Sequence, residues 1–98
     1  MNKWHVTEGA AVELENIIDY ITEHDGPDRA DAMLEKLHRA FHLIGEAPRA
    51  GVQKPRLTPP NIRWWLAVPF YVVYDCESSP IRIDHILHTA RNLPDLFD

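Results

Sequence analysis

The chain has 98 residues, 45% of them hydrophobic and 26% charged, which predicts one globular domain over residues 1–98 rather than two cores or a disordered tail. No apolar run approaches the roughly 20 residues that cross a bilayer, and the N-terminus lacks an apolar signal region, so we expect a cytoplasmic protein without membrane contact. The formal net charge of −5 argues against indiscriminate phosphate binding, and the single Cys76 excludes an internal disulfide.

The first half of the chain predicts a short strand followed by two helices. Lys3–Thr7 is apolar and aromatic at its centre, and Thr7 is suited to cap the helix that follows. From Ala11 to Ile21 apolar residues recur at helical spacing, and a second apolar stripe runs from near Asp28 up to Pro48. The Asp25-Gly26-Pro27 tripeptide breaks the pattern between them, so the two helices must pack as an antiparallel hairpin.

The second half predicts a rigid connection and three strands. The segment from Pro48 to Pro60 is rich in proline, and neither a helix nor a central strand can persist through it. Arg63–Val68, Phe70–Asp75 and Ile81–His88 are rich in aromatic and β-branched residues, which is typical of strands. The short breaks between them favour antiparallel neighbours. We expect an α+β fold of the order β-α-α-β-β-β, with the helical hairpin on one face of a mainly antiparallel sheet. For the tail from Thr89 to Asp98 we expect a docked turn.

These features together resemble the RelE/ParE superfamily of type II toxins, and the likeness covers nearly the whole chain. It rests on the order of elements and on a series of short motifs: Ala11-Val-Glu-Leu-Glu-Asn-Ile-Ile-Asp-Tyr-Ile21, Pro48-x-x-Gly51, Arg63 at the start of its strand, Tyr71-Val-Val-Tyr74, and Ile83-Asp-His-Ile-Leu-His88-x-x-Arg91.

The resemblance implies a small toxin held inactive by a cognate antitoxin that the adjacent gene encodes, with operator DNA contacted only through that antitoxin. In the ParE branch the implied target is DNA gyrase, and in the RelE branch it is messenger RNA on the ribosome. RelE-type ribonucleases often carry a tyrosine near the C-terminus, whereas this chain ends in Asn92-Leu-Pro-Asp-Leu-Phe-Asp98. We therefore expect a ParE-like poison of a protein target. The alternatives are a metal-independent mRNA endonuclease and an inactive homologue that only binds its antitoxin as a co-repressor.

Five cationic or titratable residues are candidates for target binding, or for catalysis in the ribonuclease alternative: Arg56, Arg63, His85, His88 and Arg91. ParE-like chains usually have an arginine at the position of His85 and an Asp at the position of Asn92. From Gly51 to Tyr74 the chain carries cations and no carboxylate, so a local basic surface is compatible with the acidic total. Without the resemblance, Arg63 is expected to pair with Asp75 or Asp84 across the sheet.

Three tryptophans, Trp4, Trp64 and Trp65, are candidates for antitoxin binding, although at least one of them should belong to the core. Strand alternation places Arg63, Trp65 and Ala67 on one face and Trp64 on the other.

We expect no cofactor and no metal. His38 and His42 share a helix face, but they border the apolar stripe. His85 and His88, three apart on a strand, point to opposite faces unless a bulge intervenes.

Overall fold

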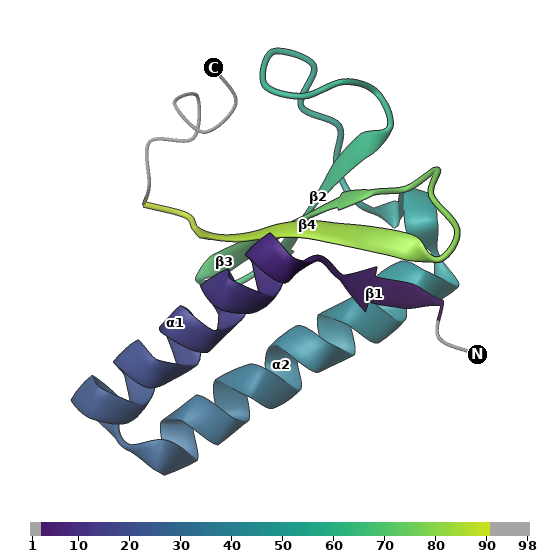
Figure 1. The fold of residues 1–98 in the computed structure, drawn as a ribbon. Helices are drawn as coiled ribbons and strands as arrows, with labels where there is room; N and C mark the ends of the chain where they lie inside the picture. Colours follow the sequence, from purple (N-terminus) through teal and green to yellow (C-terminus); the bar gives the residue numbers. More distant parts are fainter. Residues whose placement is uncertain (1–2, 91–98) are drawn as a thin grey trace.

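The computed structural model describes residues 3–90, in which a helical hairpin covers one face of a four-stranded sheet (Figure 1). The elements are β1 (Trp4–Val6), α1 (Glu8–Asp25), α2 (Pro27–Glu46), the short 3₁₀ helix η1 (Pro48–Ala50), β2 (Ile62–Ala67), β3 (Phe70–Asp75) and β4 (Ile81–His88). The strand order is β1-β4-β3-β2, with β1 parallel to β4 and the other pairs antiparallel. This confirms the predicted α+β fold. No helix within residues 3–90 has the length and apolarity needed to span a membrane.

The helix boundaries follow from local chemistry. The hydroxyl of Thr7 accepts a hydrogen bond from the Ala10 N–H at 3.2 Å, as predicted for an N-cap, and α1 begins at Glu8. Gly26 ends α1 with a φ of 93°, a conformation in which other residues are strained, and Pro27 opens α2 at its first position. One glycine therefore turns the chain from the first helix directly into the second.

The main core lies between the hairpin and the sheet. Leu37, Phe41 and Ile44 of α2 are fully buried against Val72 and Ile83 of the sheet. Trp4 and Trp65 pack on the margin of this cluster. The predicted apolar stripe of α2 therefore faces the sheet.

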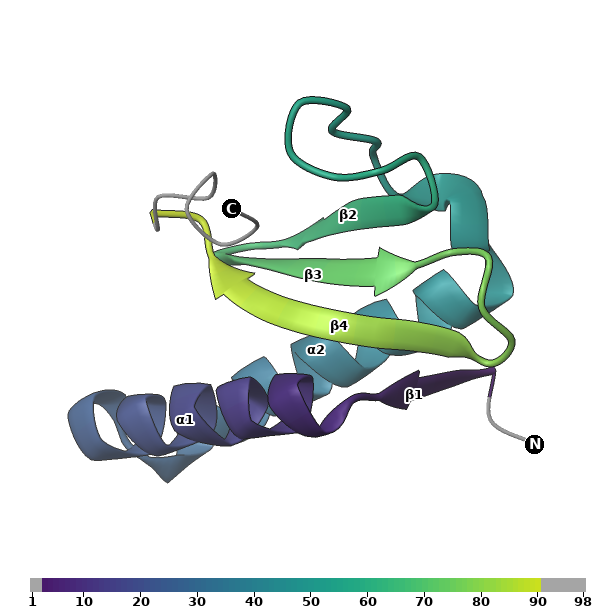
Figure 2. The same cartoon turned by 45° about the horizontal axis from the view of Figure 1, so that its top comes forward.

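A second, smaller core lies on the other face of the sheet, which we call the outer face. There the connection between η1 and β2 lies over the sheet, opposite the helices (Figure 2). Leu57 packs on the cluster of Trp64, Val73 and Leu87, and the indole Nε1 of Trp64 donates to Thr58 Oγ1 at 2.9 Å. The proline-rich connection is therefore also a cover for part of the outer face.

A β-bulge in β4 changes which residues share a face. Val73 pairs with His85 but Tyr74 pairs with Ile83, so Asp84 is an extra residue in the strand. Simple alternation along Ile81–His88 would place Leu87 on the face of Ile83. Because of the bulge, Leu87 instead belongs to the outer cluster, and Ile86 faces the helices.

The observed strand boundaries otherwise lie close to the predicted ones. β3 and β4 have the predicted bounds, and β2 is displaced by one residue because Val68 and Pro69 form the turn to β3. The predicted docked turn falls largely on residues 91–98, which lie outside the described residues.

Candidate functional site

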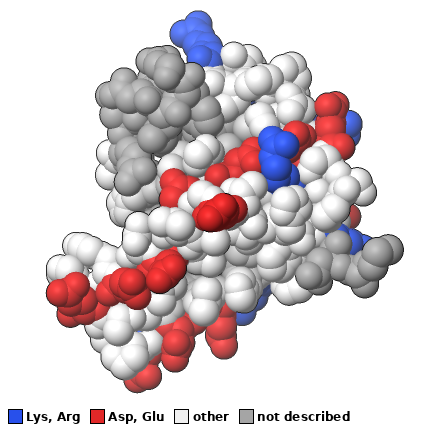
Figure 3. Space-filling view, viewed as in Figure 1, with Lys and Arg blue, Asp and Glu red and all other residues white. Residues whose placement is uncertain are grey.

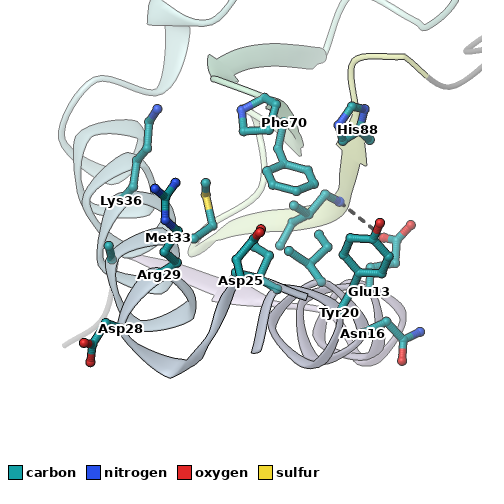
Figure 4. A pocket seen from close by; sticks show the side chains of 15 residues that line it. Glu13, Asn16, Tyr20, Asp25, Asp28, Arg29, Met33, Lys36, Phe70 and His88 are labelled. Atoms are coloured by element: carbon teal, nitrogen blue, oxygen red, sulfur yellow. Dashed lines mark hydrogen bonds between the residues drawn. The ribbon is translucent and has the colours of Figure 1, made fainter. Parts of the chain in front are cut away.

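An open groove lies between the two helices of the hairpin and the sheet (Figure 4). Its volume is about 970 Å³. Its apolar lining comes from both helices and from the sheet: Ile17, Ile21, Met33, Phe70 and Ile86. Tyr20 stands at the rim with 61% of its surface exposed. A concave apolar surface of this size with an exposed tyrosine at its edge is suited to receive part of another protein.

The walls of the groove differ in charge. The α1 wall carries the carboxylates of Glu13 and Asp25, whereas the α2 wall carries the cations of Arg29 and Lys36, with Asp28 near the helical turn. The Lys36 ammonium donates to the backbone carbonyl of Val68 at 2.6 Å, which fixes it beside the turn between β2 and β3. On the face seen in Figure 3, acidic side chains gather over the helical hairpin. A partner in the groove therefore meets a negative flank on one side and a positive flank on the other.

Glu13 joins the groove to the edge of β4. Because β1 pairs with residues 81–83, no strand within residues 3–90 continues the edge of β4 beyond Ile83. There the Glu13 carboxylate accepts the backbone N–H of Ile86 at 3.3 Å and contacts His85 Nδ1 at 3.2 Å. The hydrogen bond with Glu13 raises the pKa of His85 above its ordinary value, against an opposing effect of burial. The negative charge of Asp84 also raises the pKa of His85.

We expect this pair to make stability depend on pH. A pKa raised in the folded state adds stability below the unfolded value of about 6.5, and that stability is lost as the pH rises through the folded pKa. The pair is partly exposed, so its contribution should stay below about 1 kcal/mol. His85→Gln should lower the thermal midpoint more at about pH 5.5 than at about pH 8.5. His5→Gln, at an exposed position on β1, is the control and should show no such difference. An equal loss at both pH values would contradict the pairing.

The structure separates the candidate target-binding residues that it describes. His85 pairs with Val73 on the outer face, whereas the ring of His88 packs edge-on against Phe70 at the groove, as expected for residues on opposite faces. Arg56 is exposed on the connection over the outer face, and Arg91 lies outside the described residues. The described candidates therefore do not converge on one point.

Arg63 has a different role from the predicted ion pair. Its guanidinium Nη1 donates to the backbone carbonyls of Arg49 and Gly51, at 3.1 and 3.0 Å. Asp75 and Asp84 are instead the partners of Arg82, which is bound by Asp84 at 2.6 and 3.2 Å. The prediction of a cross-sheet pair is wrong because the chain returning from η1 brings carbonyl oxygens closer to Arg63 than either carboxylate.

Tyr74 of β3 also binds the segment that leaves η1. Its hydroxyl accepts the Gly51 N–H at 2.9 Å and donates to the Pro48 carbonyl at 2.7 Å. Burial raises the pKa of Tyr74, which keeps the hydroxyl protonated so that it can do both.

The three tryptophans occupy three different places. Trp64 is 1% exposed in the outer cluster, so the expectation that it offers its ring to a partner does not hold. Trp4 is half-buried against the rings of Phe41, His38 and His42, and Trp65 is half-buried at the margin of the main core. None of the three lines the groove.

Of the residues that line the groove, sequence reasoning selected His88 and missed the others. Tyr20 was the available signal, because it is an aromatic residue beside the apolar stripe of its helix rather than within it. No group of three His, Cys, Asp or Glu side chains within residues 3–90 is arranged to hold a metal ion.

A helical hairpin on a mixed sheet of this strand order is the fold that the resemblance to the RelE/ParE superfamily of toxins implies. The family model "ParE toxin of type II toxin-antitoxin system, parDE" matches residues 5–93. The chain therefore belongs to the ParE toxin family.

Individual relatives agree with this assignment. The chain is 26% identical to Toxin ParE3 of Caulobacter vibrioides over 87 residues, which is 89% of this chain and 86% of that protein. The solved structure described as the chromosomal ParDE TA system from P. aeruginosa has a TM-score of 0.74 and 21% identity, over 90% of this chain and 96% of that one. This structural likeness supports the fold.

Proposed function

We propose that this chain is a cytoplasmic toxin that poisons DNA gyrase and that the antitoxin encoded by the adjacent gene neutralises it. The single observation that carries the choice of a protein target is the separation of the candidate cationic residues. A ribonuclease of this superfamily needs several cations and proton-transfer groups around one phosphate. Here Arg63 is engaged with backbone carbonyls, and His85 and His88 lie on opposite faces of β4. Arg56, His85 and Arg91 remain proposed contacts to the target, whereas His88 lines the groove.

The groove supports the second half of the proposal. An amphipathic segment of an antitoxin would place its apolar side on Phe70 and Met33, with basic residues toward α1. The charge of α1 favours this orientation because the helix carries carboxylates and no lysine or arginine: Glu8, Glu13, Glu15, Asp19, Glu23 and Asp25. Trp4 and Trp65 remain proposed anchors for parts of the antitoxin that extend beyond the groove.

Tyr20→Ala should weaken binding of the coexpressed antitoxin by about 30-fold, the effect of losing roughly 2 kcal/mol at an aromatic contact. The measurement is titration of the purified toxin variants with the antitoxin. Val12→Ala is the matched control, since Val12 is 52% exposed on the same helix but does not line the groove. Both variants should retain the wild-type thermal midpoint within a few degrees. Equal affinity of both variants would contradict a role of the groove in neutralisation.

The target is tested by adding the purified chain to DNA gyrase and relaxed plasmid. We expect inhibition of supercoiling and accumulation of cleaved plasmid, while induction of the chain in cells leaves bulk mRNA intact. Prompt ribosome-dependent cuts in mRNA, mapped by primer extension, would instead support the endonuclease alternative. Tight antitoxin binding without growth arrest would support the co-repressor alternative.

A further inference from the structure

The outer face of the sheet carries an exposed patch that the groove does not include. Leu66 of β2 and Tyr71 of β3 are cross-strand partners, and Val52 pairs with Trp64 on the other edge of β2. Leu66 is 52% exposed and Val52 is 60% exposed. The Lys54 ammonium lies 5.1 Å from the centre of the Tyr71 ring and 5.7 Å from that of Trp64. We call Val52, Lys54, Leu66 and Tyr71 the outer patch.

Among the residues that the structure describes, the outer patch is flanked by positive charge. Lys54 and Arg56 belong to the stretch from Gly51 to Tyr74 that contains no carboxylate. Within residues 3–90 neither cation forms an ion pair, whereas the nearby acids Asp75 and Asp84 are already bound by Arg82. A lysine over aromatic rings, flanked by two exposed aliphatic side chains, is complementary to an acidic protein surface that also presents apolar side chains.

We propose that the outer patch is the surface through which the toxin binds its protein target, and that it recognises an acidic, partly apolar segment of that target. The inference deepens the proposed function and rests on it. It places the target and the antitoxin on opposite sides of the sheet, since the groove lies on the helical side and the outer patch on the other.

A protein partner fits the outer patch better than a nucleic acid does. Single-stranded nucleic acids bind by stacking bases on open aromatic faces. Here Lys54 lies over the rings, Trp64 is buried, and Trp64 and Tyr71 meet edge to face at 84°. The exposed surface left beside the lysine is aliphatic, which suits the apolar side chains of a protein.

The test compares Leu66→Glu and Lys54→Glu with Leu43→Glu, a control on α2 that is 48% exposed and outside both surfaces. Each variant is induced in cells to follow growth arrest, purified for the gyrase assay, and titrated with the coexpressed antitoxin. We expect Leu66→Glu and Lys54→Glu to raise the toxin concentration for half-maximal inhibition at least tenfold. Their affinity for the antitoxin should stay within threefold of wild type, which also shows that they fold. Leu43→Glu should match wild type in all three assays.

The outcomes separate this inference from the proposed function. If the wild type arrests growth without inhibiting gyrase, the gyrase target is wrong, and loss of arrest in the two variants still supports the outer patch. Retained growth arrest in both variants would overturn the outer patch as the target surface. Lost antitoxin affinity with retained arrest would assign the outer patch to the antitoxin. Prompt mRNA cleavage that the two variants lose would assign it to RNA.

Discussion

Trp64→Ala is expected to lower the free energy of unfolding by about 3–5 kcal/mol, the usual effect of truncating a large buried aromatic side chain. The indole is almost completely enclosed between the sheet and the returning connection, and it supplies the hydrogen bond to the buried Thr58 hydroxyl. Its loss therefore leaves a cavity and removes a buried donor. Because small domains are stable by only about 5–15 kcal/mol, the variant should unfold at a much lower denaturant concentration.

Equilibrium denaturation by urea measures this effect. Trp64→Phe retains most of the apolar volume and loses the N–H donor, so it should lose about half as much stability or less. Trp65→Ala, at a half-buried position on the helical face, should also lose less than Trp64→Ala. A loss below about 1 kcal/mol for Trp64→Ala would show that the outer cluster does not contribute as a core.

Gly51→Ala is expected to cost about 2–4 kcal/mol, although the backbone of Gly51 has an ordinary extended conformation. The reason is close approach: the added methyl group would lie 2.5 Å from Tyr74 Oη and 3.0 Å from Arg63 Cβ. Moving the tyrosine aside would break its hydrogen bonds to Gly51 and Pro48, each worth about 0.5–1.5 kcal/mol. A thermal scan should show a midpoint lowered by roughly 10 °C or more.

Gly9→Ala is the matched control for this substitution. Gly9 lies in α1, and apart from its chain neighbours and the backbone of the same helix no atom lies within 4 Å of the position of an added methyl group. The alanine should be neutral or stabilise the protein by up to about 1 kcal/mol, because it favours the helix. A midpoint for Gly51→Ala as high as that of wild type would show that Tyr74 and its segment rearrange without cost.

The candidate site was harder to predict than the fold because its parts come from distant segments. Tyr20, Met33 and Phe70 each have an ordinary local explanation as helix or strand residues, and only the packing of the two helices against the sheet brings them to one groove. The same holds for the outer patch, where Lys54 reaches Tyr71 from the returning connection. Single-residue signals such as Arg63 were misleading, since its partners are backbone carbonyls that no sequence pattern identifies.

The sequence by itself determined the elements and their order, because helical spacing, the Thr7 cap, the Gly26-Pro27 break and the aromatic strands are local properties of the chain. Only the tertiary structure decided which face of the sheet each strand residue occupies and which side chains contact one another. The bulge at Asp84 moves Leu87 to the outer face, since one inserted residue reverses the alternation of every residue after it. The return of the connection over the sheet encloses Trp64, binds Arg63 and holds Gly51 against Tyr74. These are contacts between segments far apart in the sequence, which local periodicity does not encode.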